Sequence, residues 1–180
     1  MEISQPVRRA AAELIHEISR TRARVSWVAP TNLHVTLKFL GEIEQDSVAE
    51  ICSAVSAAIE QASVPVQLAL SGVGAFPSDD RPRTIWIGAA TSSDRLAELH
   101  RDIDTELADV GFRPESRPYR PHLTIGRVRG SRHLREITDM LSRHATFDAG
   151  VCGIAEFVLF SSERQREEPL YVPLARFPIC

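Results

Sequence analysis

Lysine is almost absent from this chain, whose 21 basic residues are arginines except for Lys38. Long apolar runs are also missing, since none approaches the roughly 20 residues that a bilayer crossing requires. Residues 1–10 contain no continuous apolar segment of the kind found in a secretory signal. We therefore expect a cytoplasmic protein with no membrane partner.

Cysteine is scarce as well. Cys52, Cys152 and Cys180 are widely separated and odd in number, which does not fit a disulfide framework or a metal-binding spacing. We expect Cys52 and Cys152 to be small core residues. The remaining composition, 43% hydrophobic and 25% charged in 180 residues, is typical of one globular domain.

The net charge of -3 argues by itself against a nucleic-acid partner, but the charges are unevenly distributed. One segment is strongly positive and contains only Glu115 as an acidic residue. Its basic residues are Arg113, Arg117, Arg120, Arg127, Arg129, Arg132 and Arg135. Such a segment suits an anionic ligand.

A short pattern occurs twice, as His34-Val35-Thr36-Leu37 and, 88 positions later, as His122-Leu123-Thr124-Ile125. One copy alone would favour an ordinary half-exposed strand. Two copies favour a pair of acid-base units, because an imidazole beside a hydroxyl can hold an anion and move a proton. The doubled pattern is typical of phosphodiester chemistry.

Strand geometry predicts which side chains act together. Successive residues of a strand point to opposite faces, so His34 and Thr36 should share one face. Val35, Leu37 and Phe39 should lie on the other face. The same alternation pairs His122 with Thr124 in the second copy.

The 88-residue offset also aligns the segments around the motifs. A helical stripe over 6–22 matches another over 94–110, and a helix that begins near Ser47 matches one over 134–141. Strand-rich stretches are expected at 64–76, 84–88, 154–162 and 170–174.

These elements predict an α+β fold of two pseudo-twofold lobes in a single domain, 1–180. Each lobe should contain an antiparallel sheet with two helices, with lobe one at about 1–76, lobe two at about 83–180 and the active-site groove between them.

One element of the repeat has no counterpart. The offset would place a partner of strand 84–88 before residue 1. We therefore expect the first strand of lobe one to be missing, with Met1 to Ile3 supplying at most a remnant. If the start is truncated, residues added upstream should raise the melting temperature.

The sequence segments around the motifs resemble those of a known family. Residues 32–42 read NLHVTLKFLGE, Phe76-Pro77 precedes RTIWIG at 83–88, and residues 121–127 read PHLTIGR. From about Pro6 onward the chain resembles the RNA 2',3'-cyclic phosphodiesterase branch of the 2H phosphoesterases, historically called 2'-5' RNA ligase. The resemblance implies a two-lobed fold with the site between the lobes.

For a cyclic phosphate, a base must activate water on one side of phosphorus while an acid protonates the leaving oxygen on the other. The resemblance implies metal-independent hydrolysis without a cofactor, on RNA ends or small 2',3'-cyclic nucleotides, giving a 2'-phosphomonoester. It also implies His34 as the acid and His122 as the base. Thr36 and Thr124 are placed to donate hydrogen bonds to phosphate oxygens.

Arg127 is a further candidate phosphate ligand, because guanidinium forks suit phosphate and the family motif carries an arginine there. Strict alternation puts Arg127 on the face opposite His122, but a bulge at Gly126 would turn it. Alternation places Lys38 on the same face as His34 and Thr36. An ordinary strand residue that faces solvent would fit this position equally well.

The other aromatic and imidazole side chains are less specific candidates for the site. Phe76 and Tyr119 could stack a nucleobase, although core or surface positions fit them equally well. Trp27 and Trp86 are expected in the core. The other histidines lie on predicted helices without a paired hydroxyl or a zinc-binding companion, and they are His16, His100, His133 and His144.

Two alternatives stay open at this point. Reversible 2'-5' ligation without a nucleotide cofactor would use the same groups in reverse. A nucleotide- or RNA-binding module of the same fold would not turn over, but both motifs are intact, which favours an enzyme. We expect a monomer.

Overall fold

The computed structural model describes residues 1–61, 66–91, 95–163 and 169–179. The helices are α1 (Gln5–Ile18), α2 (Val48–Gln61), α3 (Arg95–Asp109) and α4 (Leu134–Arg143), with short 3-10 turns at Pro30–Asn32 and Gln45–Ser47. The strands are β1 (Val25–Trp27), β2 (Val66–Phe76), β3 (Thr84–Thr91), β4 (His122–Val128), β5 (Asp148–Ile154), β6 (Glu156–Glu163) and β7 (Leu170–Pro178).

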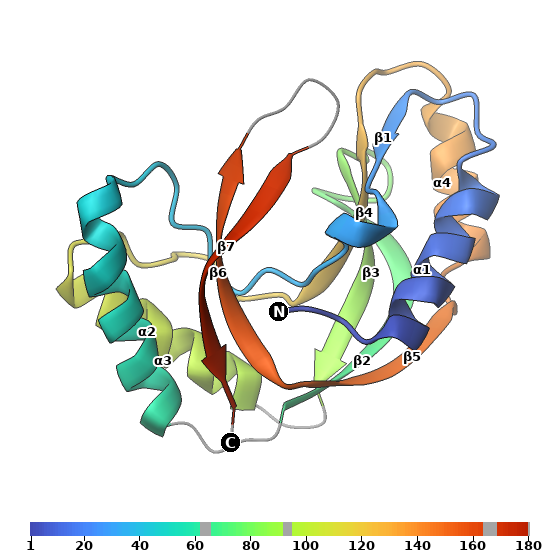
Figure 1. The fold of residues 1–180 in the computed structure, drawn as a ribbon. Helices are drawn as coiled ribbons and strands as arrows, with labels where there is room; N and C mark the ends of the chain where they lie inside the picture. Colours follow the sequence, from blue (N-terminus) through green and yellow to red (C-terminus); the bar gives the residue numbers. More distant parts are fainter. Residues whose placement is uncertain (62–65, 92–94, 164–168, 180) are drawn as a thin grey trace.

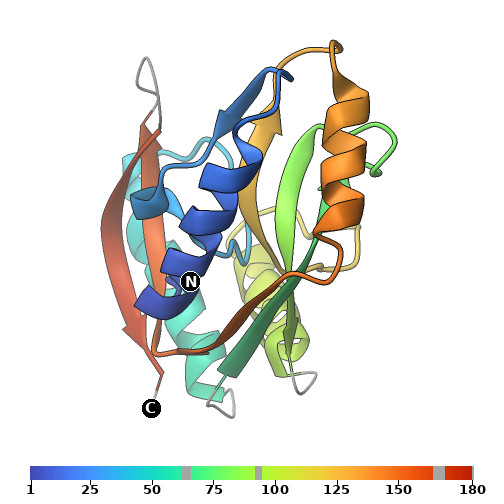
Figure 2. The same cartoon turned by 90° about the vertical axis from the view of Figure 1, so that its right-hand side faces the viewer.

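The larger sheet is antiparallel throughout, with the strand order β1-β4-β3-β2-β5. Helices α1 and α4 lie side by side over one face of this sheet, where α1 contacts β5 and α4 contacts β2 (Figures 1 and 2). Apolar stripes on both helices are buried, which is why they pack there.

The second layer is the antiparallel β6-β7 hairpin with α2 and α3, which pack against one another (Figure 1). The predicted α+β fold of two lobes with two helices each is confirmed. The sheets do not divide the chain at 76 and 83, however, because β1 and β2 from the first half lie in the same sheet as β3, β4 and β5.

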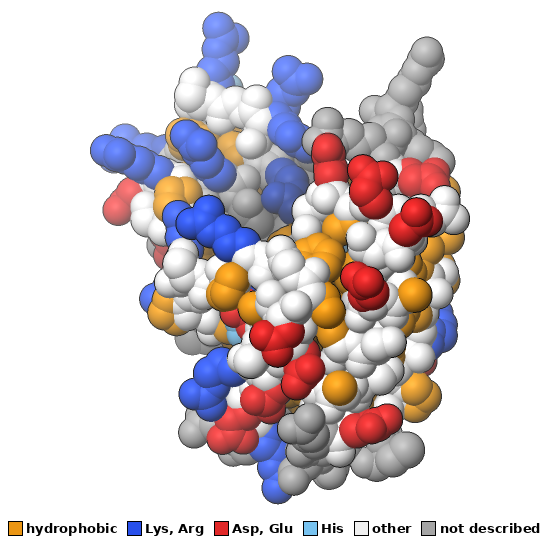
Figure 3. Space-filling view, turned by 90° about the vertical axis from the view of Figure 1, so that its left-hand side faces the viewer, with side chains coloured by type: hydrophobic (Ala, Val, Ile, Leu, Met, Phe, Trp, Pro, Cys, Tyr) orange, Lys and Arg blue, Asp and Glu red, His pale blue; other side chains and the backbone are white. Residues whose placement is uncertain are grey.

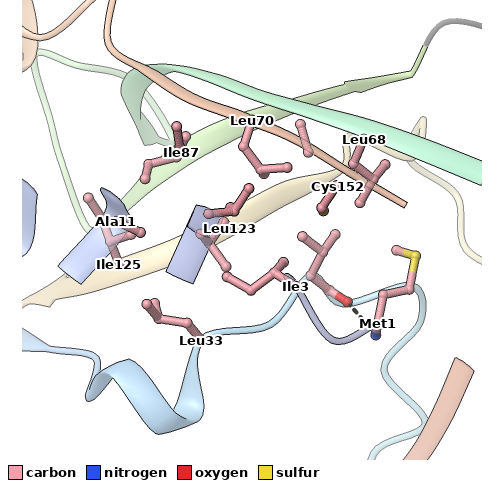
Figure 4. Packing of buried hydrophobic residues seen from close by; sticks show 14 of the residues in the cluster. Met1, Ile3, Ala11, Leu33, Leu68, Leu70, Ile87, Leu123, Ile125 and Cys152 are labelled. Atoms are coloured by element: carbon pink, nitrogen blue, oxygen red, sulfur yellow. Dashed lines mark hydrogen bonds between the residues drawn. The ribbon is translucent and has the colours of Figure 1, made fainter. Parts of the chain in front are cut away.

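Much of the core lies between the larger sheet and the buried faces of α1 and α4 (Figure 4), and strand alternation decides which side chains of the sheet enter it. Ile85 and Ile87 are 0% exposed. Trp86 between them points to the opposite face of β3, so its predicted place in the core is wrong. Trp27 is half-buried and packs against the core, with its ring over Gly126.

The first three residues fill the place expected of a remnant strand. Glu2 forms an antiparallel bridge with His34, as Gly88 of β3 pairs with His122. The Met1 ammonium donates to the Val35 carbonyl at 2.9 Å, drawn as a dashed line in Figure 4. Met1 is 5% exposed, so this short segment is part of the core.

Most predicted elements are present, with differences at their ends. α1 ends at Ile18 rather than near 22, because a turn with a hydrogen bond from Thr21 N to Ile18 O follows it. Residues 64, 65 and 94 of the predicted elements lie outside the described part of the chain.

Sequence patterns missed two strands. β1 has three residues at a sheet edge, too few to show alternation. Most of β5 was missed because it contains two glycines, and Gly150 has a φ of +92°, which weakens any strand pattern.

Cys152 is buried and Cys52 packs half-buried against the core, as predicted, while Cys180 lies outside the described residues. In the described ranges, no helix has the length and apolar character to span a membrane.

Candidate active site

The two motifs lie side by side in the folded chain. Val35 and Leu123, the apolar residues that follow each motif histidine, form an antiparallel bridge and are both 0% exposed. Residues 88 positions apart in the sequence are thus direct neighbours at the centre of the molecule. The bridge joins the two halves of the repeat where their motifs meet.

This bridge arranges the polar residues of the motifs. In an antiparallel pair the residues next to a bridged pair also lie opposite one another. His34 is therefore across from Thr124, and Thr36 is across from His122. All four point away from the buried face and are half-buried. The four side chains therefore occupy the corners of one small surface, with the two imidazoles on one diagonal and the two hydroxyls on the other.

The first motif is less regular than predicted. Only residues 34 and 35 make β bridges, and the predicted strand does not continue to Phe39. Phe39 is 74% exposed, so the alternation expected to place it on the same face as the buried Val35 does not extend that far. The reason is that the partner segment, residues 1–3, is too short to hold a longer strand.

Each catalytic candidate makes the same local hydrogen bond. The Nδ1 atom of His34 contacts the backbone carbonyl of Asn32 at 2.7 Å, and that of His122 contacts the carbonyl of Arg120 at 2.8 Å. A carbonyl only accepts, so Nδ1 carries the proton in both rings. In the neutral form, Nε2 then has a free lone pair and can accept a proton.

Each imidazole also meets the edge of an aromatic ring. The centroids of His34 and Tyr171 are 4.9 Å apart at 70°, and those of His122 and Phe76 are 4.9 Å apart at 84°. These contacts restrain both rings. Sequence patterns gave no signal for Tyr171, because β7 approaches His34 only through the tertiary fold.

The environment of His34 favours its neutral form. Burial lowers the pKa of His34 below its usual value of 6.5. The positive charges of the Met1 ammonium, Arg8 and Arg127 lower this pKa further, while the hydrogen bond with Asn32 acts in the opposite direction. In the free protein His34 is therefore uncharged near neutrality.

A β-bulge turns Arg127 toward the motif face. Trp86 is paired with Thr124, but the next residue of β3, Ile85, is paired with Gly126, so β4 has one extra residue here. Thr84 and Trp86 share a face, and Arg127 is opposite Thr84. Arg127 therefore lies on the same face as Thr124, which strict alternation would have prevented.

Tyr119 ties the second motif segment to the first. Its hydroxyl donates to the Thr36 backbone carbonyl at 3.0 Å, and burial raises the pKa of Tyr119, so the hydroxyl keeps its proton. The ring stacks on His100 with centroids 4.4 Å apart and planes within 8°. Tyr119 thus holds the backbone of the motif, and one ring face is covered by His100.

Lys38 does not lie free in the site. Its ammonium is paired with Asp104 of α3 and donates to the Arg113 carbonyl at 3.3 Å, and its side chain is 5% exposed. This buried pair fixes the chain after the first motif to α3. The solvent-facing alternative for Lys38 is wrong, and its charge is already neutralised.

The remaining histidines lie away from the motifs. His16 is exposed on α1, His133 and His144 flank α4 near Glu136 and Glu17, and His100 packs against Tyr119. Within the described ranges, no three His, Cys, Asp or Glu side chains are grouped so that they could hold a metal ion.

The arginine-rich segment is exposed at all seven positions between 113 and 135. On the face seen in Figure 3, basic side chains gather toward the upper left, and acidic side chains lie over the right and the lower part. The net charge of -3 therefore conceals a separation of charge across the surface.

Comparison with known proteins gives a consistent result. Residues 6–166 match the model of the 2'-5' RNA ligase superfamily. A Methanocaldococcus jannaschii protein named RNA 2',3'-cyclic phosphodiesterase is 33% identical over 147 residues, 82% of this chain and 80% of that protein. An Archaeoglobus fulgidus protein of the same name is 30% identical over 177 residues, 98% of this chain and 96% of that protein.

Solved structures agree on the fold. TT0787 of Thermus thermophilus superposes with a TM-score of 0.80 at 22% identity, covering 98% of this chain and 93% of that one. Escherichia coli LigT in complex with NADP+ gives 0.75 at 22% identity, covering 99% and 94%. The match over most of its length shows that the chain belongs to the 2'-5' RNA ligase superfamily, the family that its two motifs resemble.

Proposed function

We propose that this protein hydrolyses the 2',3'-cyclic phosphate of RNA ends or small nucleotides to a 2'-phosphomonoester, with two histidines as acid and base. The observation that carries the proposal is the bridge between Val35 and Leu123, which places two His-Thr pairs on one surface. The names of the relatives support the same substrate class.

The chemistry requires two proton transfers. The base takes a proton from water as its oxygen bonds to phosphorus, the bond from phosphorus to the 3' oxygen breaks, and the acid protonates that oxygen. Both histidines donate through Nδ1 to a backbone carbonyl, which leaves Nε2 of each ring for substrate. One ring must be neutral and the other an imidazolium.

Family resemblance assigns the acid role to His34 and the base role to His122. Burial disfavours an imidazolium at His34 in the free protein. A bound phosphate supplies negative charge that raises the pKa of a nearby imidazole. We propose that His34 gains its proton with the substrate, so that the acid forms only in the complex.

The other candidates would stabilise the phosphate. Thr36 and Thr124 offer hydroxyl donors beside the opposite motif's histidine, and Arg127 adds a permanent charge on the same face. No protein group in this scheme needs a metal ion or a cofactor. Because both motifs come from one chain, we expect a monomer to be active.

The deciding experiment incubates the protein with 2',3'-cyclic AMP in EDTA and separates 2'-AMP from 3'-AMP. The expected product is 2'-AMP, and His34→Gln and His122→Gln should each remove most turnover while preserving the circular dichroism spectrum. A 3' product would refute the leaving-group assignment. Near-normal rates in either variant would refute the two-histidine mechanism, and loss of turnover in EDTA would refute metal independence.

The same assay separates the alternatives. Incubating an RNA with a 2',3'-cyclic end together with an RNA that has a free 5'-hydroxyl would reveal 2'-5' linkage formation, in which that hydroxyl replaces water as the group that attacks phosphorus. Binding of the cyclic nucleotide without turnover over pH 5 to 9 would instead indicate a non-catalytic module.

A further inference from the structure

A row of arginines continues the motif face of β4 beyond the proposed active site. Arg127 lies on this face after the bulge, and Arg129 follows two residues later with the same orientation. In β1, Ser26 is paired with Arg127, and the Arg129 amide donates to the Arg24 carbonyl at 2.8 Å. Arg24 and Arg129 therefore lie opposite one another on the motif face.

The charges in this row have no ion-pair partner among the described residues. Arg24, Arg127 and Arg129 are exposed, and in the described part of the chain no carboxylate forms an ion pair with any of them. Among the described residues, the hydrogen bond that the side chains of this row make is from Arg129 Nε to Ser26 Oγ at 3.0 Å. Elsewhere, Arg22 is paired with Glu136 at 2.7 Å.

The spacing of the row suits a nucleic-acid strand. Arg127 and Arg129 are same-face residues of one strand and lie about 6.6 Å apart along it, close to the separation of successive phosphates in an extended nucleic-acid strand. The row starts at the residues proposed to hold the cyclic phosphate and runs away from them. A 2',3'-cyclic phosphate closes the 3' end of RNA, so every further phosphate lies on its 5' side.

We propose that Arg24 and Arg129 bind backbone phosphates of the RNA strand on the 5' side of the cyclic end. The preferred substrate is then a polynucleotide end rather than a free cyclic mononucleotide. This inference rests on the proposed function, because it takes the cyclic phosphate to be bound by the motif residues.

The test compares two substrates at two salt concentrations. In Arg24→Gln/Arg129→Gln, kcat/KM for an oligonucleotide with a 2',3'-cyclic end should fall, while kcat/KM for 2',3'-cyclic AMP stays unchanged. Two lost phosphate contacts should reduce the log-log salt slope by about 1.4. Between 50 and 200 mM KCl the wild type should therefore lose about sevenfold more oligonucleotide activity than the variant.

Arg83→Gln is the matched control. Arg83 is also exposed and directly precedes β3, but its carbonyl accepts from Val128 N, which places it on the opposite face from Arg127. Its removal changes the net charge without touching the row and should leave the salt slope unchanged. An equal effect in Arg83→Gln would overturn the proposal, because it would show a general charge effect.

Two further results would overturn it: unchanged oligonucleotide kinetics in the double variant, or equal losses with both substrates. Fluorescence anisotropy with a 3'-phosphate-terminated oligonucleotide gives a readout that does not need turnover. If the wild type hydrolyses neither substrate, the proposed function fails, but weaker oligonucleotide binding by the double variant and not by Arg83→Gln would still support the phosphate row. Equal binding by all three proteins would refute it.

Discussion

The hydroxyl of Tyr119 donates a hydrogen bond to the backbone carbonyl of Thr36, so a residue three positions before one motif holds the backbone of the other. His100 covers the ring of Tyr119 from α3. The contact links the segment between α3 and β4 to the first motif at the residue whose side chain faces His122. Its loss should disturb the site more than the fold.

Tyr119→Phe keeps the stacked ring and removes only this hydrogen bond. We expect the free energy of unfolding to fall by about 1 kcal/mol. We expect kcat to fall severalfold with little change in KM, because the Thr36 backbone loses its restraint. Tyr171→Phe is the control, since its ring contacts His34 through the edge and its hydroxyl makes no hydrogen bond to the described residues. Equal kcat in wild type and Tyr119→Phe would contradict a positioning role.

His34 should titrate below 6.5 in the free protein, because burial lowers its pKa. NMR of the ring protons would show this, and added inorganic phosphate should move the titration upward. The unfolded chain takes up this proton at a higher pH, so the free energy of unfolding should increase with pH through the window just below 6.5. His34→Gln should remove that part of the dependence. A pKa unmoved by phosphate would contradict the proposed acid role.

Residues added upstream of Met1 should stabilise the protein in a pH-dependent way. Burial lowers the pKa of the Met1 ammonium from 8.0 to about 6. The free N-terminus therefore lowers the free energy of unfolding by about 2 kcal/mol at pH 6, and by much less at pH 8. An amide in its place carries no charge. Adding Ser-Ala before Met1 should therefore raise the melting temperature more at pH 6 than at pH 8. An equal change at both values would rule out this explanation.

Thr36→Val and Thr124→Val keep the branched shape and remove a hydroxyl donor. If each hydroxyl stabilises the phosphate in the transition state, kcat/KM for 2',3'-cyclic AMP should fall about a hundredfold in either variant. Thr105→Val removes a hydroxyl that donates to the Arg101 carbonyl within α3, and it should leave kcat/KM unchanged. A loss below threefold at both motif positions would exclude the hydroxyls as phosphate donors.

Gly126→Ala should destabilise the sheet at the bulge. An added Cβ would lie 2.7 Å from the ring of Trp27 and 3.0 Å from Val25. Such overpacking costs about 1 to 3 kcal/mol, measurable by urea unfolding. Gly130→Ala, with nothing within 4 Å of the new atom, should change stability by less than about 0.5 kcal/mol. Similar values for both variants would show that the ring moves away freely.

Local patterns were sufficient for much of the fold. The apolar period of the four helices and the alternation around Ile85 and Ile87 follow from backbone geometry, which the sequence encodes directly. The same alternation placed each histidine with its threonine. Applied to Trp86, it would also have predicted the face away from the core.

Contacts between distant segments could not be predicted in this way. The alternation predicted for Phe39 is wrong because its partner segment, residues 1–3, ends early. The solvent-facing alternative for Lys38 is wrong because Asp104 lies across from it on α3. The strand β1 could not be predicted, because its three residues form a strand only by pairing with β4.

The sequence by itself determined the repeat, its two His-Thr pairs and the family, because these reside in residue identity and spacing along the chain. Only the tertiary structure decided that Val35 is beside Leu123, that a bulge turns Arg127, and that Arg24 joins its row. These relationships depend on the register between strands. Between strands that are far apart in the chain, register depends on which faces the assembled core buries, and no short stretch of sequence contains that information.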